Sequence, residues 1–376
     1  MSSLNPFFYL LSLVLPDSRK RKNAACKSPE EIMKGSYSPS VDDILDVKDC
    51  LLAKFPIEVI DAIIDFAEYW PHIRVALKKD AAHGSYKNIG GANENEFLLR
   101  SYPLAFIPKD HDLADLTFQG RSFPTSSPNP GPEGDDYSHE LTKLYVQRWA
   151  EESRVRGSHP CRKIVFTIES HDQGWGGIPN SRGTYEDSFT WFDVGKEEAC
   201  IYDVGKCSSS QPSSPRLPEV PDDNFRDPFF IVPSLSTFAP RKNSSECTDT
   251  NTIYCTSRTI LPRMVLDTPD PTPNNSRRPS QFEHPLLPDS KVLQKNITAE
   301  KETKKHVITW SYNDNIDPDS HAGTLLEKQG RGRATANGEF VRSLRIGETV
   351  TVWGKSRFPG WSNFVEGLSI DVYWAV

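Results

Sequence analysis

Three adjacent residues near the middle of the chain, Ser170, His171 and Asp172, carry the side chains of a nucleophilic relay. Such a relay works when each of the three side chains hydrogen-bonds to the next. Neighbouring residues of an extended strand point to opposite faces of the sheet, so these three cannot form a relay with one another. They also lack the Gly-x-Ser-x-Gly turn that exposes a catalytic serine. We therefore assign no catalytic residue and expect the polar end of a strand here.

Tryptophan and arginine residues in glycine-rich turns indicate a ligand-binding surface instead. Indole rings offer flat faces for stacking, and guanidinium groups donate paired hydrogen bonds to anionic or hydroxyl-rich ligands. The candidate ligand-binding residues are Trp175, Arg182, Arg331, Arg333 and Trp361. The alternative is that these turns are corners of a β-sandwich, with the rings inside and the arginines over its rim.

A dense group of oxygen-bearing side chains runs from Asn313 to Asp319, as it does in calcium-binding loops. The sixth position of this run is Pro318, whereas an EF-hand loop requires glycine there. We therefore expect Asx turns after a strand. Neither a metal site nor a cofactor is assigned.

The elements that must position these residues are mainly strands. Apolar side chains alternate with polar ones over residues 164–168 and again over 368–374, which is the period of a half-buried strand. Six of the eight tryptophans fall in these two β-rich blocks: Trp175, Trp191, Trp310, Trp353, Trp361 and Trp374. The sequence predicts one jelly-roll-like antiparallel β-sandwich written in two parts, residues 86–206 and 300–376.

The segment between the two blocks, residues 207–299, has a different composition. It is rich in serine and asparagine, and 14 of the 30 prolines lie between Gln211 and Ser290. Such segments bury too little apolar surface to fold alone, so we predict a disordered insertion. A structureless loop of this length is unusual inside a compact domain, which leaves an inter-domain linker as the alternative.

The N-terminal part contains a helical pattern. We predict that residues 1–45 are disordered and that residues 46–80 form a helical segment. Apolar residues from Phe55 to Ala67 recur at spacings of three and four, which gives the helix one apolar side. Pro56 fits the first turn of this helix, and Pro71 ends the pattern.

Residues 55–65, Phe-Pro-Ile-Glu-Val-Ile-Asp-Ala-Ile-Ile-Asp, resemble the opening of an F-box. In that family the segment docks on a Skp-type adaptor of a cullin–RING ubiquitin ligase. The resemblance implies that this contact is made by Pro56, Glu58, Val59, Ile63 and Ile64. A full F-box continues with more helix, whereas this chain reaches Pro71 and then a Gly/Asn loop. The alternative is a helix that packs on its own β domain.

A larger resemblance covers most of the chain outside the predicted insertion. Its motifs are Ser170–Gly177, Arg182–Tyr185, Trp191–Phe192, Gly330–Ala334, Asn337–Phe340 and Phe358–Trp361. They are similar to those of a widespread, uncharacterised fungal protein family that pairs an F-box-like N-terminus with a β region. That β region resembles jelly-roll and galactose-binding-like sandwiches, including those of F-box proteins that read glycans or protein surfaces. The resemblance implies no particular chemistry.

Charge and cysteine content restrict the function classes further. The net charge of −7 argues against a general nucleic-acid binder, which needs a basic face. The seven cysteines form no Cys-x-x-Cys pair, which is typical of reduced thiols in a cytoplasmic or nuclear protein. The apolar stretch Phe7–Leu15 is too short to span a bilayer and has the wrong flanking charges for a signal peptide, so we expect no membrane association.

Together these features predict a non-enzymatic interaction protein. The first hypothesis is an F-box-like substrate receptor whose helix binds a Skp-type adaptor and whose sandwich binds a protein or glycan target. The second is a carbohydrate-binding β-sandwich with no ubiquitin-ligase connection.

Overall fold

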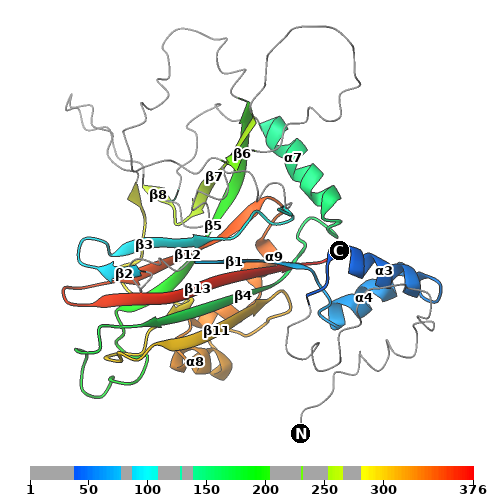
Figure 1. Ribbon diagram of the computed structural model, residues 1–376. Helices are drawn as coiled ribbons and strands as arrows, with labels where there is room; N and C mark the ends of the chain where they lie inside the picture. Colours follow the sequence, from blue (N-terminus) through cyan, green and yellow to red (C-terminus); the bar gives the residue numbers. More distant parts are fainter. Residues whose placement is uncertain are drawn as a thin grey trace, which may run out of the picture.

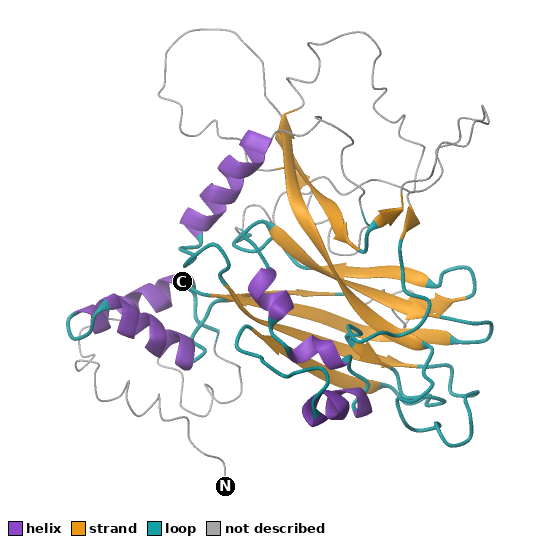
Figure 2. Ribbon diagram, turned by 180° about the vertical axis from the view of Figure 1, so that it is seen from behind, coloured by secondary structure: helices purple, strands orange, loops and turns teal. Residues whose placement is uncertain are grey.

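The computed structural model describes residues 38–77, 87–108, 128, 139–203, 230–231, 253–265 and 281–376. In these residues two antiparallel β-sheets pack together, and the helices lie at the ends and edges of the sheets (Figures 1 and 2). The predicted mainly β class with a small α part is confirmed.

The strands form two large sheets and one small one. The first sheet has the order β1 (His72–Ala76), β13 (Ser362–Trp374), β4 (Cys161–His171), β11 (Lys304–Ser311), and β2 (Lys87–Gly90) also pairs with β13. The second has the order β3 (Asn95–Arg100), β12 (Glu348–Ser356), β5 (Thr190–Asp203), β7 (Ile253–Leu261), β6 (Phe230–Ile231), and β10 (Gln294–Lys295) also pairs with β5. The small sheet pairs β8 (Met264–Val265) with β9 (Gln281–Phe282).

The two predicted β blocks are joined in both large sheets. β13 pairs with β4, placing Ile370 opposite Phe166, and β12 pairs with β5, placing Val352 opposite Val194. The chain passes from the first sheet to the second between β4 and β5, returns between β10 and β11, and crosses again between β11 and β12 and between β12 and β13. Residues far apart in the sequence therefore build one sandwich.

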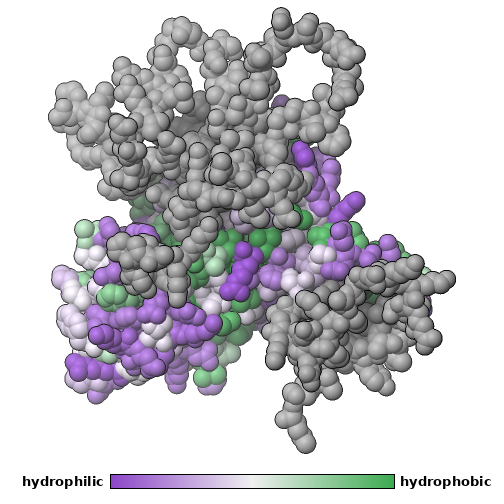
Figure 3. All heavy atoms as spheres, viewed as in Figure 1, coloured by the Kyte–Doolittle hydropathy of each residue, from purple (hydrophilic) through white to green (hydrophobic). Residues whose placement is uncertain are grey.

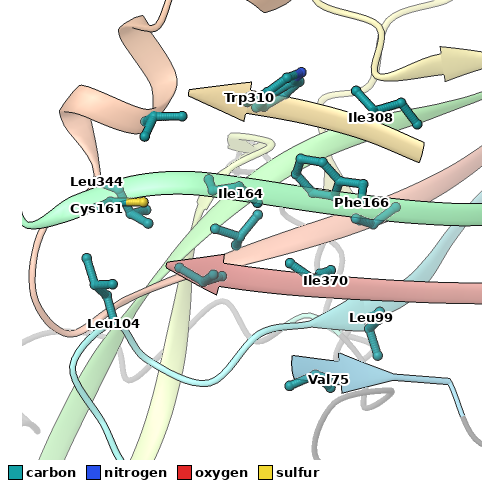
Figure 4. Close-up of a cluster of buried hydrophobic side chains, with 14 of the residues drawn as sticks. Val75, Leu99, Leu104, Cys161, Ile164, Phe166, Ile308, Trp310, Leu344 and Ile370 are labelled. Atoms are coloured by element: carbon teal, nitrogen blue, oxygen red, sulfur yellow. The ribbon is translucent and has the colours of Figure 1, made fainter. Parts of the chain in front are cut away.

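The main core lies between the two sheets. Ile164 and Phe166 of β4 and Ile370 of β13 are completely buried, and Figure 4 shows them beside Ile308 and Trp310 of β11. Trp310 meets Phe166 edge to face, with the ring centroids 5.1 Å apart. Burial of apolar surface of this kind stabilises a fold by about 25 cal/mol per Å².

The helices extend this core. α3 (Val41–Leu52) begins at Ser40, whose side chain forms a capping box with Asp43, and α4 (Ile57–Phe66) follows Pro56. α7 (His139–Glu152) covers β5 and buries Tyr145 and Trp149. The remaining helical elements are α8 (His321–Lys328), the 3₁₀ helix η4 (Arg333–Ala336) and α9 (Glu339–Ser343).

Two N-terminal boundaries differ from the prediction. α3 starts at Val41, inside the segment predicted to be disordered, because its capping box and the buried Ile44 stabilise an additional helix. The predicted helical segment 46–80 is also too long. After Pro71 the chain enters β1, whose residues pair with β13, so the backbone hydrogen bonds are made in a sheet. Residues 1–37 and 78–86 lie outside the described part.

The predicted insertion is likewise partly incorrect. Residues 253–265 and 281–299 contribute β7 to β10, and Val292 and Leu293 are completely buried. Strand pairing and burial outweigh the Pro- and Ser-rich composition here. The rest of 207–299, apart from β6, lies outside the described residues.

Asn296 joins this segment to both large sheets. Its side chain accepts a hydrogen bond from Ser170 Oγ at 2.7 Å. It donates to Thr190 Oγ1 at 3.1 Å and to Asn363 Oδ1 at 2.9 Å. Asn296 is 1% exposed, so water does not replace these bonds when they are lost.

We therefore expect Asn296→Ala to lower the free energy of unfolding by about 2–4 kcal/mol, because several buried polar groups lose their partner at once. Urea denaturation measures this change. Asn313→Ala, at an exposed asparagine, is the control. Equal midpoints for the two variants would contradict the role given to Asn296.

Candidate functional site

α4 presents apolar side chains on two sides. Ile60 and Ile64, one turn apart, are completely buried against the sandwich. Val59, Ile63 and Phe66 form a second stripe at i, i+4 and i+7, and these positions share one side of a helix. Val59 is 42% and Phe66 is 90% exposed, and Ile63 is partly buried. A helix that is apolar on both sides is normally covered on both sides.

Exposed apolar residues continue into the turn before α4. Leu52, Phe55 and Ile57 are each between 41% and 49% exposed. We call the surface formed by Leu52, Phe55, Ile57, Val59, Ile63 and Phe66 the outer apolar face. Of the predicted partner-binding residues, Pro56, Glu58 and Val59 are exposed on or beside this face, Ile63 is partly buried in it, and Ile64 belongs to the protein's own core.

Ion pairs fix α4 to the rest of the protein. Asp61 binds Lys48 at 2.6 Å and Arg156 at 3.0 Å, and Arg156 also binds Asp65 at 2.5 Å. Burial alone raises the pKa of Asp61, but the hydrogen bonds and charges of Lys48 and Arg156 outweigh burial and hold that pKa below its usual value. Lys48 also donates to the carbonyl of Val376. The direction of α4 is therefore set by the sandwich.

The two tryptophans predicted to bind a ligand lie on turns at the end of β4 and the start of β13, away from α4. The ring of Trp175 is 63% exposed and lies against Gly360, where an added Cβ would approach Trp175 Cη2 to 2.9 Å. Gly360 also has φ +89°, a conformation that favours glycine. Trp361 is partly buried and packs edge to face on Phe189 at 5.0 Å.

Gln173 connects the two turns that carry these tryptophans. It donates to the carbonyl of Trp175 at 2.7 Å and accepts from the backbone N–H of Ser362 at 3.1 Å. Arg182 is exposed and folds back on the first turn, with Nε donating to the carbonyl of Gly176 at 2.9 Å. We call Trp175, Arg182 and Trp361 with their two turns the aromatic corner.

Arg331 and Arg333 lie on a different segment, between α8 and α9. Arg333 is paired with Glu327, its Nε donating to Oε2 at 2.7 Å. Burial lowers the pKa of Arg331, against the opposing charge of Asp314. The five predicted ligand-binding residues therefore form two groups.

The adjacent Ser170, His171 and Asp172 have separate partners. Ser170 donates to Asn296, while the ring of His171 stacks on Phe364 with centroids 4.8 Å apart. The carboxylate of Asp172 accepts from the backbone N–H groups of Gly174 and Ala299. Burial raises the pKa of Asp172, although these hydrogen bonds oppose the shift. All three side chains help to hold the end of β4 and its turn.

A cluster of charged residues that the sequence does not predict lies on the face of the second sheet that points away from the first. Trp191 and Asp193 of β5 lie opposite Lys355 and Trp353 of β12, so two indoles and two charges alternate across the strands. Lys355 is only 1% exposed. A buried lysine at such a position needs specific partners.

Neutral groups supply the hydrogen bonds of this cluster. Lys355 Nζ lies 2.5 Å from His284 Nδ1 and donates to Asn95 Oδ1 at 3.2 Å. Arg357 donates to the same Asn95 oxygen at 2.7 Å and to the carbonyl of Pro285 at 2.8 Å. These contacts also attach residues 284–285 to the sheet.

Burial shifts every titratable group of the cluster. It raises the pKa of Asp193 to about 6, opposed by Lys355 and reinforced by the charge of Asp289. It lowers the pKa of Lys355 to about 7, opposed by Asp193 and reinforced by Arg357. It also lowers the pKa of His284 to about 3, so that this ring is neutral near pH 7. Shifts of this size occur at functional sites and also in structural networks.

The only signal in the sequence for this cluster is the matching pair Trp191-x-Asp193 and Trp353-x-Lys355, in which each charge shares a strand face with a tryptophan. Pairing of β5 with β12 brings the two together, and the sequence alone does not predict that register.

Comparison with known proteins identifies no relative. No family model matches the chain, and neither does any curated protein or solved structure.

Two further features are absent from the described part of the chain. None of its helices is long and apolar enough to cross a membrane. Its His, Cys, Asp and Glu side chains form no group that could hold a metal ion.

The buried lysine predicts a pH dependence of stability. Between about pH 7 and pH 10.5 the unfolded chain keeps a proton on Lys355 that the folded protein has released, so the free energy of unfolding rises with pH by up to about 1.4 kcal/mol per unit. We expect Lys355→Met to lose this rise, and Lys291→Met, at an exposed lysine, to keep it. Urea denaturation from pH 7 to 9.5 measures it, and equal slopes in all three proteins would contradict the assignment.

Proposed function

We propose that this protein is a non-enzymatic receptor that docks on a Skp-type adaptor through the outer apolar face. The observation that carries the proposal is that α4 is apolar on two sides and that the described part of the chain covers only one of them. Amphipathic helices that bind partners do so with anchors at i, i+4 and i+7, the spacing of Val59, Ile63 and Phe66. The F-box-like residues 55–65 include Val59 and Ile63, and Phe66 follows directly.

The arrangement of the sandwich also supports a receptor. The α3–α4 pair lies beside the C-terminus at one end of β4 and β13, and the turns of the aromatic corner leave the other end (Figure 1). β4 alone has 11 residues, which span about 35 Å. A partner at one end therefore leaves the other end free for a target.

The first test replaces exposed apolar residues of the outer face. We expect Val59→Asp and Phe66→Asp to weaken adaptor binding by about 30-fold or more, because each would bury a carboxylate in an apolar contact. Co-purification and calorimetry with a Skp-type adaptor measure the effect. Thermal unfolding of both variants should resemble that of the unmodified protein.

Leu325→Asp provides a matched control, since Leu325 is a 44% exposed leucine on another helix, α8. It should leave adaptor binding unchanged. If the unmodified protein binds no adaptor, or if both outer-face variants still bind it, the proposal is wrong.

A second candidate function is carbohydrate binding at the aromatic corner. The observation that favours it is Trp175, an indole 63% exposed on a turn that Gly360 and Gln173 hold in place. Sugar rings stack on such fixed aromatic faces, and the neighbouring Arg182 can donate hydrogen bonds to hydroxyl groups.

For this candidate we expect Trp175→Ala to remove the glycan-array signal of the unmodified protein while thermal unfolding and adaptor binding stay unchanged. Leu286→Ala, at another strongly exposed apolar side chain, should keep the signal. If the target is a protein, neither the unmodified protein nor Trp175→Ala should give a signal on the glycan array.

A further inference from the structure

Three buried or partly buried arginines allow a comparison within the chain. Arg100 donates from Nε and Nη2 to the two carboxylate oxygens of Glu197, at 2.6 and 2.9 Å. Arg333 uses the same two nitrogens on Glu327, with Nη2 at 2.5 Å. The Arg100–Glu197 pair is bidentate, because two parallel N–H groups match the two oxygens of one carboxylate. Both nitrogens of Arg333 instead approach the same oxygen, Oε2 of Glu327.

Arg331 differs from both. Its Nε and Nη2 are buried, and neither has a hydrogen-bond partner among the described residues. Its carboxylate neighbour Asp314 instead accepts from the backbone N–H of Ser311 at 2.8 Å, which holds it in a turn. A buried donor without a partner costs about 1–3 kcal/mol, and a charged one costs more.

Backbone contacts hold Arg331 in this position. The preceding Gly330 has φ +80° and lies on the ring of Tyr185, where an added Cβ would approach Cδ1 to 2.4 Å. Gly330 also accepts a backbone hydrogen bond from Lys295 at 2.8 Å, and the N–H of Arg331 donates to Leu326. The backbone that holds the two unpaired nitrogens of Arg331 is therefore well fixed.

Other unpaired polar atoms lie on the neighbouring edge strand. His306 Nε2 and Trp310 Nε1 of β11 are buried without a partner. The ring of His306 meets the ring of Tyr185 edge to face, with the centroids 5.9 Å apart, and Gly330 packs on the same tyrosine. The ring of Trp310 contacts that of Phe340 of α9, with the centroids 5.3 Å apart. Figure 4 shows Trp310 at the edge of the core cluster, above Phe166 and Ile164. Four buried polar atoms without a hydrogen-bond partner among the described residues thus belong to this one edge of the sandwich.

We propose that Arg331 binds an oxyanion, a carboxylate or phosphate group, through Nε and Nη2 at the edge of the sandwich between β11 and the α8–η4 segment. The geometry is that of the Arg100–Glu197 pair, with the ligand in the place of the glutamate. Arg331 as a whole is only partly buried, so the site lies just below the surface. The site is separate from the outer apolar face and does not depend on the proposed adaptor binding.

The strand β11 and the helix α8 lie in a part of the surface that is mainly hydrophilic in the view of Figure 3. Lys304 and Lys305 of β11 already pair with Glu302 and Glu169, so the proposed site depends on Arg331. Burial strengthens the electrostatic attraction between the guanidinium and an anion that replaces water there.

The experiment is thermal unfolding of the full chain in sodium acetate or sodium phosphate, compared with sodium chloride at equal ionic strength. We expect a saturable rise in Tm, about 3 °C at ten times Kd, in at least one of the two oxyanions. The acetate and phosphate series decide between a carboxylate and a phosphate ligand. Arg331→Gln should lose the rise, whereas Arg333→Gln should keep it because Glu327 already occupies that fork.

A second measurement separates ligand binding from a structural role. In chloride, Arg331→Met should have a Tm equal to or above that of the unmodified protein, since it removes an unpaired buried charge. Arg100→Met should lower Tm, because it leaves Glu197 buried without its partner. A drop in Tm for Arg331→Met, or an oxyanion effect that survives Arg331→Gln, would overturn the proposal.

Discussion

The pairing of β13 with β4 is the constraint on which the rest of the structure depends. β13 lies between β1 and β4 in the first sheet and also pairs with β2, so it aligns three other segments of the chain. At its end, the carbonyl of Val376 receives Lys48 and thereby holds the helical pair. At its start, Ser362 is bound by Gln173 of the aromatic corner. One strand thus sets the positions of both candidate binding surfaces.

Charge burial on the second sheet is the main cost of this architecture. Arg100 and Glu197 have fully buried side chains, and their two short hydrogen bonds offset the loss of water. A buried ion pair of this kind adds little net stability, but removal of one partner costs several kcal/mol. Lys355 has only neutral hydrogen-bond partners, so its protonation is the part of the network that pH changes most easily. On this sheet the Arg100–Glu197 pair therefore affects stability mainly when one partner is removed, whereas Lys355 makes stability depend on pH.

The sequence predicted those features that depend on local patterns. Alternation identified β4 and β13, and glycine residues identified the turns that carry Trp175 and Trp361, because both patterns are local. β7 and β10 were missed, since their pairing with β5 is non-local and prolines mask the strand pattern. Arg331 and Arg333 look equivalent in sequence, yet only the folded chain places Glu327 beside Arg333. Long-range register decided each of these cases.

Rigidity is what would make two binding surfaces on this sandwich act together. Asp61 and Asp65 fix α4 through Arg156, which follows α7, and buried isoleucines fill the space between helix and sheet. A partner on the outer apolar face and a target at the aromatic corner would then be held at one separation and in one orientation. A flexible connection would spread the target over many positions and lower its effective concentration near anything bound at the other end. The ion pairs around Asp61 would then fix the distance and orientation between the two binding surfaces, in addition to stabilising the fold.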